Sequence, residues 1–185
     1  TETDTETNQA AYDLSRRYSR SENHDTFVQE YEQRAGITIS ELAVDGLNTA
    51  KARMKLSFRK PVDSGGDFLY ICPTIVPFIE KNPFTSQKRQ LPVEFSYPYR
   101  YRIIVSLMLP EGYTVEELPK SQRLSACDEG IACTMQVQQQ GALVQCLFEF
   151  DLSRIIFPAT EYTDLSAFYG FVMDMCNSRI VLKKS

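Results

Sequence analysis

Hydrophobic and polar side chains alternate along much of the chain after residue 36. In the segment 50–59 every second residue is apolar, and most of the residues between are basic. The apolar set is Ala50, Ala52, Met54, Leu56 and Phe58, and the polar set is Lys51, Arg53, Lys55, Ser57 and Arg59. A period of two places the two sets on opposite faces of a strand. The pattern therefore predicts an antiparallel sheet with one buried face and one solvated face.

Further strand-like segments follow at the spacing of hairpins. They cover residues 68–71, 99–109, 113–118, 124–127, 131–137, 142–152 and 179–183. The segment 99–109 is almost continuously apolar, which predicts a central strand buried on both faces. Gly130 and Gly141 lie in short polar stretches between strands, where glycine can adopt the positive φ that tight turns require.

Two parts of the chain have the spacing of helices. Near the C-terminus, an apolar stripe at intervals of three and four residues predicts an amphipathic helix. The stripe consists of Leu165, Phe168, Tyr169, Val172, Met173 and Cys176. In the N-terminal part, Phe27 and Tyr31 have helical spacing, with Asn23 or Asp25 as the cap and Gly36 as the end of that helix.

These elements predict a mainly β (α+β) protein. We expect an antiparallel β-sandwich or twisted sheet, with an N-terminal helical segment and one C-terminal amphipathic helix. Residues 1–35 are interpreted as a helical or extended linker from an upstream domain, and residues 36–185 as the antiparallel β-rich domain with its C-terminal helix. The chain opens at Thr1 without Met or a signal-peptide pattern, as expected of a fragment or a processed form.

The distribution of charge narrows the classes of partner. The chain of 185 residues has a formal net charge of −4, which argues against nucleic acid because its binding needs a concentrated basic surface. Residues 51–123 carry 12 basic and 7 acidic side chains (+5), so an acidic partner for this region stays open. No apolar run reaches the roughly 20 residues of a membrane-spanning helix.

The titratable residues do not form a recognisable catalytic or metal-binding pattern. The chain has five cysteines and one histidine, with no pair of cysteines at zinc-site spacing. His24 lies in a polar stretch typical of a solvated helix entrance, and Cys133, Cys146 and Cys176 fall on expected core faces. We therefore expect no enzyme active site, no metal and no cofactor in this chain.

Two surfaces are candidates for binding. Tyr97, Tyr99 and Tyr101 share one strand face and can form an aromatic platform for sugars or a protein, or simply pack across strands. The basic face of the first strand can meet an anionic polymer, or can serve only to keep a solvated sheet face from aggregating. Its candidate residues are Lys51, Arg53 and Lys55, followed by Arg59.

A disulfide between Cys133 and Cys146 is a further hypothesis. If the turn at 138–141 pairs Val137 with Ala142, opposite residues have numbers that sum to 279, as 133 and 146 do. The two cysteines would then face each other across the hairpin, although directly opposed positions give strained disulfide geometry. A different register would exclude the bond.

Several short motifs resemble a C-terminal domain of unknown function found in bacterial multidomain proteins that carry a transglutaminase-like core. The motifs comprise Asn82, Pro83, Phe84, Arg89, Pro92, Val93, Phe95, the run Pro110–Lys120, Glu161, Tyr162, Phe168 and the run Ile180–Lys184. The resemblance covers roughly residues 36–184. It implies an exported protein of Gram-negative bacteria, periplasmic or extracellular, whose Cys-His-Asp core lies upstream of Thr1. It assigns no catalytic residue to this chain.

Two functions of different classes follow as expectations. The first is a non-catalytic accessory module that packs on the upstream core or on another envelope protein. Such a module should expose a contiguous apolar patch, which we expect near the segment 73–92. The alternative is a module that binds carbohydrate or a cell-envelope polymer such as polysaccharide, with aromatic rings presented flat to solvent in a groove.

Overall fold

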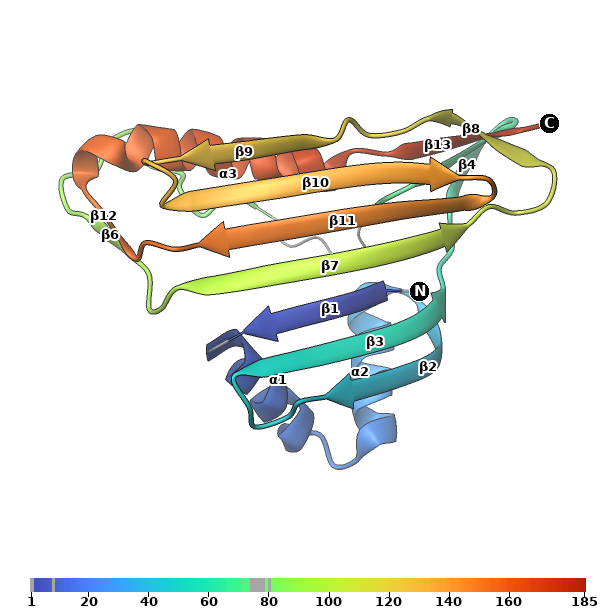
Figure 1. Cartoon of the computed structure of the whole chain (residues 1–185), viewed down its shortest axis with the longest axis horizontal. Coiled ribbons are helices and arrows are strands. Elements are labelled where there is room, and N and C mark those ends of the chain that lie inside the picture. Colours follow the sequence, from blue (N-terminus) through green and yellow to red (C-terminus); the bar gives the residue numbers. More distant parts are fainter. Residues whose placement is uncertain (1, 8, 74–78, 80) are drawn as a thin grey trace.

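The computed structural model describes residues 2–7, 9–73, 79 and 81–185. Its main feature is an antiparallel sheet of seven strands in the order β2-β3-β1-β7-β11-β10-β9 (Figure 1). The strands are β1 (Glu2–Thr7), β2 (Thr38–Asp45), β3 (Lys51–Arg59), β7 (Tyr99–Met108), β9 (Gln122–Ala126), β10 (Ile131–Gln140) and β11 (Leu143–Leu152). The strands predicted from alternation are present, and the antiparallel arrangement is confirmed.

The register of the central strands places all the buried residues on one face of this sheet, here called the inner face. Met54 of β3 and Ile103 of β7 both lie opposite Asp4 of β1, so they point to the same side. On the other face, Arg100 pairs with Asp151 and Arg102 with Glu149 across β7 and β11. The prediction that 99–109 is buried on both faces is wrong, because these arginines are exposed to solvent.

Helix α3 (Tyr162–Asn177) covers the part of the inner face that β9, β10 and β11 form (Figure 1). Its buried residues are Tyr162, Leu165, Phe168, Tyr169, Val172, Met175 and Cys176. They pack against the inner-facing side chains of β10 and β11, including Phe148 and Phe150. The predicted C-terminal amphipathic helix is therefore confirmed, with Met175 rather than Met173 on the buried stripe.

A second, smaller sheet covers one end of the inner face. It has the order β4-β5-β13-β8 and consists of β4 (Asp63–Gly65), β5 (Phe68–Ile71), β8 (Tyr113–Glu117) and β13 (Ile180–Lys184). Ile180 and Leu182 of β13 form a buried cluster with Val144 of β11. The two packed sheets confirm the expected β-sandwich or twisted-sheet class. A separate short pair joins β6 (Val93–Glu94) to β12 (Ile156–Phe157).

The N-terminal segment covers the remaining part of the inner face. Helices α1 (Gln9–Arg20) and α2 (His24–Ala35) form a cluster with Ala52, Met54 and Leu56 of β3. Asn23 caps α2, since its Oδ1 accepts a hydrogen bond of 2.9 Å from the Thr26 backbone N–H. Gly36 ends the helix in the left-handed conformation, with φ of 63°.

Strand β1 lies inside the large sheet although it contains no apolar residue. It pairs with β3 on one side and β7 on the other, and its alternating threonines suit an extended backbone. Glu6 is buried on the inner face, where burial raises the pKa of its carboxyl and the Arg17 guanidinium, 3.3 Å away, opposes this shift. Residues 1–35 thus contain one strand and two helices. Their assignment as a linker separate from residues 36–185 stays a prediction.

Candidate functional site

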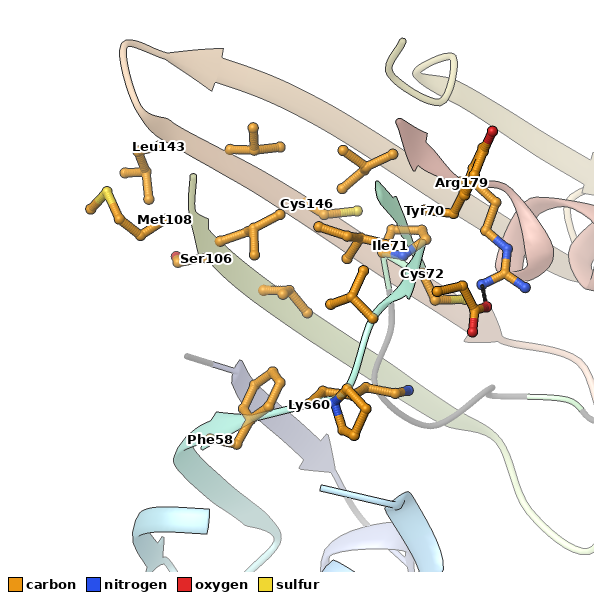
Figure 2. Close-up of a pocket in the computed structure, with 18 of the residues that line it drawn as sticks. Phe58, Lys60, Tyr70, Ile71, Cys72, Ser106, Met108, Leu143, Cys146 and Arg179 are labelled. Atoms are coloured by element: carbon orange, nitrogen blue, oxygen red, sulfur yellow. Dashed lines mark ion pairs between the residues drawn. The ribbon is translucent and has the colours of Figure 1, made fainter. Parts of the chain in front are cut away.

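A cavity of about 650 Å³ lies between the large sheet and the small sheet (Figure 2). It is found where three buried clusters meet: Phe58 belongs to the N-terminal cluster, Cys146 to the cluster under α3, and Ile180 to the cluster under the small sheet. The described side chains of these three clusters leave the cavity between them.

Apolar side chains from both sheets form the walls of the cavity. On the large sheet, Val105 and Leu107 of β7 lie opposite Cys146 and Val144 of β11, and all four point inward. Ile71 of β5 and Ile180 of β13 belong to the facing sheet, and Phe58 lies at the end of β3. A cavity of this size and lining is typical of a site that accepts an apolar group.

Three charged residues lie at the opening. Lys60 lies in the connection between β3 and β4, and Asp63 is the first residue of β4. Arg179 directly precedes β13. The Arg179 Nη1 and Asp63 Oδ2 atoms are 3.9 Å apart, with 47% and 81% of their side chains exposed (Figure 2). Such a surface pair contributes only about 0–1 kcal/mol, so it is easily rearranged.

Exposed apolar side chains surround the same opening. Val62, Tyr70 and Met108 line the cavity and are 40%, 38% and 66% exposed. They are three of the seven large apolar residues exposed in the part of the chain that the structure describes. We call these three residues the rim. Exposed apolar side chains of this kind are candidates for contact with another molecule.

The family of the chain is shown by its sequence from β5 to β13. A model of the domain family of unknown function DUF3858, which has a solved structure, matches residues 67–182. The chain belongs to this family. The DUF3858 match contains most of the small sheet, strands β7 to β11 and helix α3, and so most of the cavity walls.

One solved structure is similar to the DUF3858 chain in fold. It is described as "a putative protease" from Parabacteroides distasonis, with a TM-score of 0.51 and 16% sequence identity. The similarity covers 63% of this chain and 23% of that protein. At this identity the likeness concerns the fold alone. Comparison with curated proteins found no match.

The tyrosines of the DUF3858 domain that were predicted to form a platform are packed against neighbouring side chains. Tyr99 stacks on Phe150 at 5.7 Å between ring centroids, and burial raises its pKa to about 12. Tyr97 is half-buried and its hydroxyl donates a hydrogen bond of 2.9 Å to Asp13 Oδ2. Tyr101 packs at the edge of the cluster under α3. A role of these rings in binding stays a prediction.

The predicted basic face lies outside the cavity. Lys51, Arg53 and Lys55 are exposed on β3, on the face opposite to Met54, as their alternation indicated. Arg53 lies opposite Asp45 in the register of β2 and β3. None of the three residues contributes to the cavity lining among the described residues. Their binding of an anionic polymer also stays a prediction.

The predicted disulfide between Cys133 and Cys146 is wrong. Gln140 pairs with Leu143, so the numbers of opposite residues on β10 and β11 sum to 283. In this register Cys133 lies opposite Phe150, and Cys146 lies opposite Val137. The two cysteines are therefore offset by four positions, roughly 13 Å along the strands. Both are free thiols in the structure.

The buried thiols near the cavity are expected to have low reactivity as nucleophiles. Burial, followed by the charges of Cys176 and Cys72, raises the pKa of Cys146 to about 12. Burial likewise raises the pKa of Cys133. Cys72 is half-exposed, and its Sγ donates a hydrogen bond of 3.4 Å to the Cys176 carbonyl oxygen. Thiolates, which are the nucleophilic form, are therefore scarce at the buried positions.

The histidine lies in the environment that the sequence indicated. His24 is exposed at the first turn of α2, with its Nδ1 3.0 Å from the Tyr18 hydroxyl. In the described part of the chain, no group of three or more His, Cys, Asp or Glu residues could hold a metal ion. No described helix is long and apolar enough to cross a membrane.

Sequence reasoning missed the cavity, and its expectation of an apolar patch near the segment 73–92 stays a prediction, although Pro73 of that segment lines the cavity. The expected position was the segment 73–92, of which residues 74–78 and 80 lie outside the described part of the chain. Within that segment Leu91 is 72% exposed, but the rim comes from β5, the end of β7 and the connection before β4. Val105 and Leu107 were predicted only as part of a strand buried on both faces; in the structure they are partly buried at the edges of two clusters and line the cavity between them.

Proposed function

We propose that this chain is a non-catalytic accessory module that binds another protein domain through the rim of the cavity. The proposed partner is the transglutaminase-like core of an exported bacterial protein, located in the periplasm or outside the cell, or else another envelope protein. The observation that carries the proposal is the exposure of Val62, Tyr70 and Met108 around one apolar cavity.

The energetic reason for docking at the rim is the removal of apolar surface from water. Full burial of a Val, Leu, Ile, Phe or Met side chain is worth about 1.5–3 kcal/mol relative to exposure. Met108 is the most exposed of the three rim residues and therefore has the most to gain. Clusters of such residues at the centre of an interface usually contribute most of its binding energy.

The state of the thiols supports a non-catalytic role. A cysteine nucleophile needs a lowered pKa and an imidazole within hydrogen-bond reach. Cys146 has a pKa raised to about 12 by burial, and the exposed His24 has the Tyr18 hydroxyl as its neighbour. The similar solved structure is also a longer protein, in which this fold covers 23% of the chain. That supports a role as one part of a larger assembly.

Titration calorimetry tests the proposal directly. The chain is titrated with the separately expressed transglutaminase-like polypeptide that the proposal places upstream of it. We expect a dissociation constant of about 1 μM or tighter, the affinity of a specific domain contact. Met108→Asp should weaken binding at least ~10-fold, because it places a charge in a desolvated contact.

A matched substitution controls for the added charge. Leu91 is 72% exposed, close to the 66% of Met108, and does not line the cavity. Leu91→Asp should leave the affinity unchanged. Equal losses in the two variants, or no heat of binding with the unmodified chain, would refute docking through the rim.

A further inference from the structure

The two outer strands of the large sheet differ in how well they can accept a further strand. An outer strand presents backbone N–H and C=O groups that can pair with another chain. At one edge, the pairing of β2 with β3 shifts register between Ile39 and Glu41, and irregularities of this kind hinder further pairing. At the other edge, β9 pairs with β10 in unbroken register from Gln122 to Ala126 (Figure 1). Among the described strands, β9 is therefore the regular open edge of this sheet.

An apolar groove lies directly beside this edge. It has a volume of about 290 Å³ and is formed by β9, the connection before it, and α3. Leu124 of β9 and Phe171 of α3 line it, together with buried methionines of β10 and α3. Its charged residues are Lys120 and Asp174, one of each sign. Phe171 is 58% exposed although the neighbouring apolar residues of α3 are buried, so a strand added to β9 would bring its own side chains against this ring.

A second copy of the chain fits this edge with complementary charges. If β9 pairs antiparallel with β9 of a second copy over its full length, its first residue lies opposite the last residue of the second β9, and opposite numbers sum to 248. Leu124 then lies opposite Leu124 of the second copy, and Arg123 lies opposite Ser125. Just outside the strand, the exposed Lys120 lies opposite the exposed Asp128 at each end. This register joins opposite charges twice and places no like charges directly opposite each other.

The same pairing brings the two exposed rings together. Opposite residues of an antiparallel pair point to the same face, so Leu124 of both copies would lie on the inner side of one continuous sheet. The two α3 helices would lie on that side as well, next to the twofold axis. Because Phe171 borders the groove beside Leu124, each ring would pack against the groove of the other copy and leave the solvent.

We infer that the chain forms a reversible homodimer through the β9 edge, with β9 antiparallel to β9 of a second copy and Phe171 buried between the two α3 helices. The surface is separate from the rim, because β11 and β10 lie between β7 and β9. The inference therefore goes beyond the proposed function and does not depend on it.

The size of the contact sets the expected affinity. Stable complexes bury roughly 1,200–2,000 Å² of surface, more than a pair of five-residue strands with two helix faces supplies. We therefore expect a weak dimer, with a dissociation constant of about 10–100 μM. At protein concentrations well below this value the chain is a monomer, in which Phe171 is exposed.

Sedimentation equilibrium of the full chain, over concentrations on both sides of the expected dissociation constant, measures the association. We expect the average mass to rise from monomer to dimer. Phe171→Glu should raise the dissociation constant at least ~10-fold, because it places a charge in a desolvated contact. Leu91→Glu is the matched control, since Leu91 is 72% exposed and does not line the groove, and it should leave the association unchanged.

A charge exchange tests the register. Lys120→Glu and Asp128→Lys should each weaken the dimer at least ~5-fold, because each places like charges opposite one another at both ends. An equimolar mixture of the two variants should recover the association, since both end pairs of the mixed dimer again join opposite charges. Asp128 has a positive φ of 51°, where lysine is less readily accommodated than aspartate. If Asp128→Lys does not fold, Lys120→Glu and Phe171→Glu still decide the question.

The outcomes distinguish this dimer from other uses of the two surfaces. A monomer at every concentration, or a dimer that Phe171→Glu leaves intact, would exclude the β9 contact. A folded pair of charge variants whose mixture stays monomeric would exclude the register. Loss of the dimer in Met108→Asp but not in Phe171→Glu would place self-association at the rim and overturn the inference. A monomeric chain whose binding to the upstream polypeptide depends on Phe171 would assign the β9 edge to that partner and exclude the homodimer.

Discussion

Phe150 is the residue through which the contact between α3 and the large sheet is best tested. Its side chain is 0% exposed on the inner face of β11. Its ring lies 5.7 Å from Tyr99, 6.1 Å from Phe168 and 6.0 Å from Tyr169, measured between ring centroids. Phe150→Ala would remove the ring from the point where β7, β11 and α3 meet.

The size of the loss follows from these contacts. A buried Phe→Ala substitution costs about 3–5 kcal/mol in free energy of unfolding, and each aromatic pair adds roughly 0.5–1.5 kcal/mol beyond the area that it buries. Since Phe150 contacts three rings among the described residues, we expect a loss in the upper part of that range, about 4–5 kcal/mol. For a domain of this length that corresponds to a fall in Tm of roughly 8–20 °C.

Equilibrium unfolding in urea, followed by far-UV circular dichroism, measures the effect. The matched control is Phe171→Ala, because Phe171 lies on α3 but is 58% exposed, and surface substitutions usually change stability by less than ~0.5 kcal/mol. A loss below about 1 kcal/mol for Phe150→Ala, or equal losses for both variants, would refute the packing of α3 on β11.

Three further expectations concern the helix cap, an ion pair and the thiols. Asn23→Ala should cost about 1 kcal/mol in urea unfolding, while Asn23→Asp keeps the cap and most of the stability; equal losses would exclude the cap. Arg123→Gln should raise the pKa of Glu129, which hydrogen bonds from Arg123 and Ser125 lower to about 2. Because the pKa is lowered in the folded state, this carboxylate contributes stability above its ordinary pKa and loses it as pH falls towards 2; an unchanged carboxyl titration by NMR would contradict the pairing. In the folded chain at pH 8, a thiol reagent should label the half-exposed Cys72 at least ~100-fold faster than Cys146, whose pKa is about 12; peptide mapping that finds similar rates would contradict the burial of Cys146.

Local periodicity predicted the elements of this fold well. The alternation in 50–59 identified β3 and its buried face, and the stripe from Leu165 to Cys176 identified α3. Asn23, one of the two cap candidates, and Gly36 lie at the two ends of α2. In each case the sequence signal lies in the element itself or directly beside it. A strand or helix with one buried face places apolar residues at its own structural period, so the pattern can be read locally.

Pairing between elements was predicted less well. The run of three glutamines before Gly141 allows more than one turn, so the sequence did not determine whether opposite residues of β10 and β11 sum to 279 or 283. The two registers differ by four residues, and because four is an even number the same residues lie on the inner face in both. The apolar pattern is therefore satisfied by both registers and cannot choose between them.

The sequence by itself determined most of the strands after residue 50, the C-terminal helix, the antiparallel class and the buried face of β3, but not the one-sided burial of β7. Only the tertiary structure decided that the polar β1 lies between β3 and β7, since nothing in its alternating Thr and acidic residues marks an internal strand. It also decided the candidate site. Periodicity records that a residue faces inward, but whether anything fills the space above Val105 and Leu107 depends on how α2, α3 and the small sheet fit together, and that fit is a property of the whole chain.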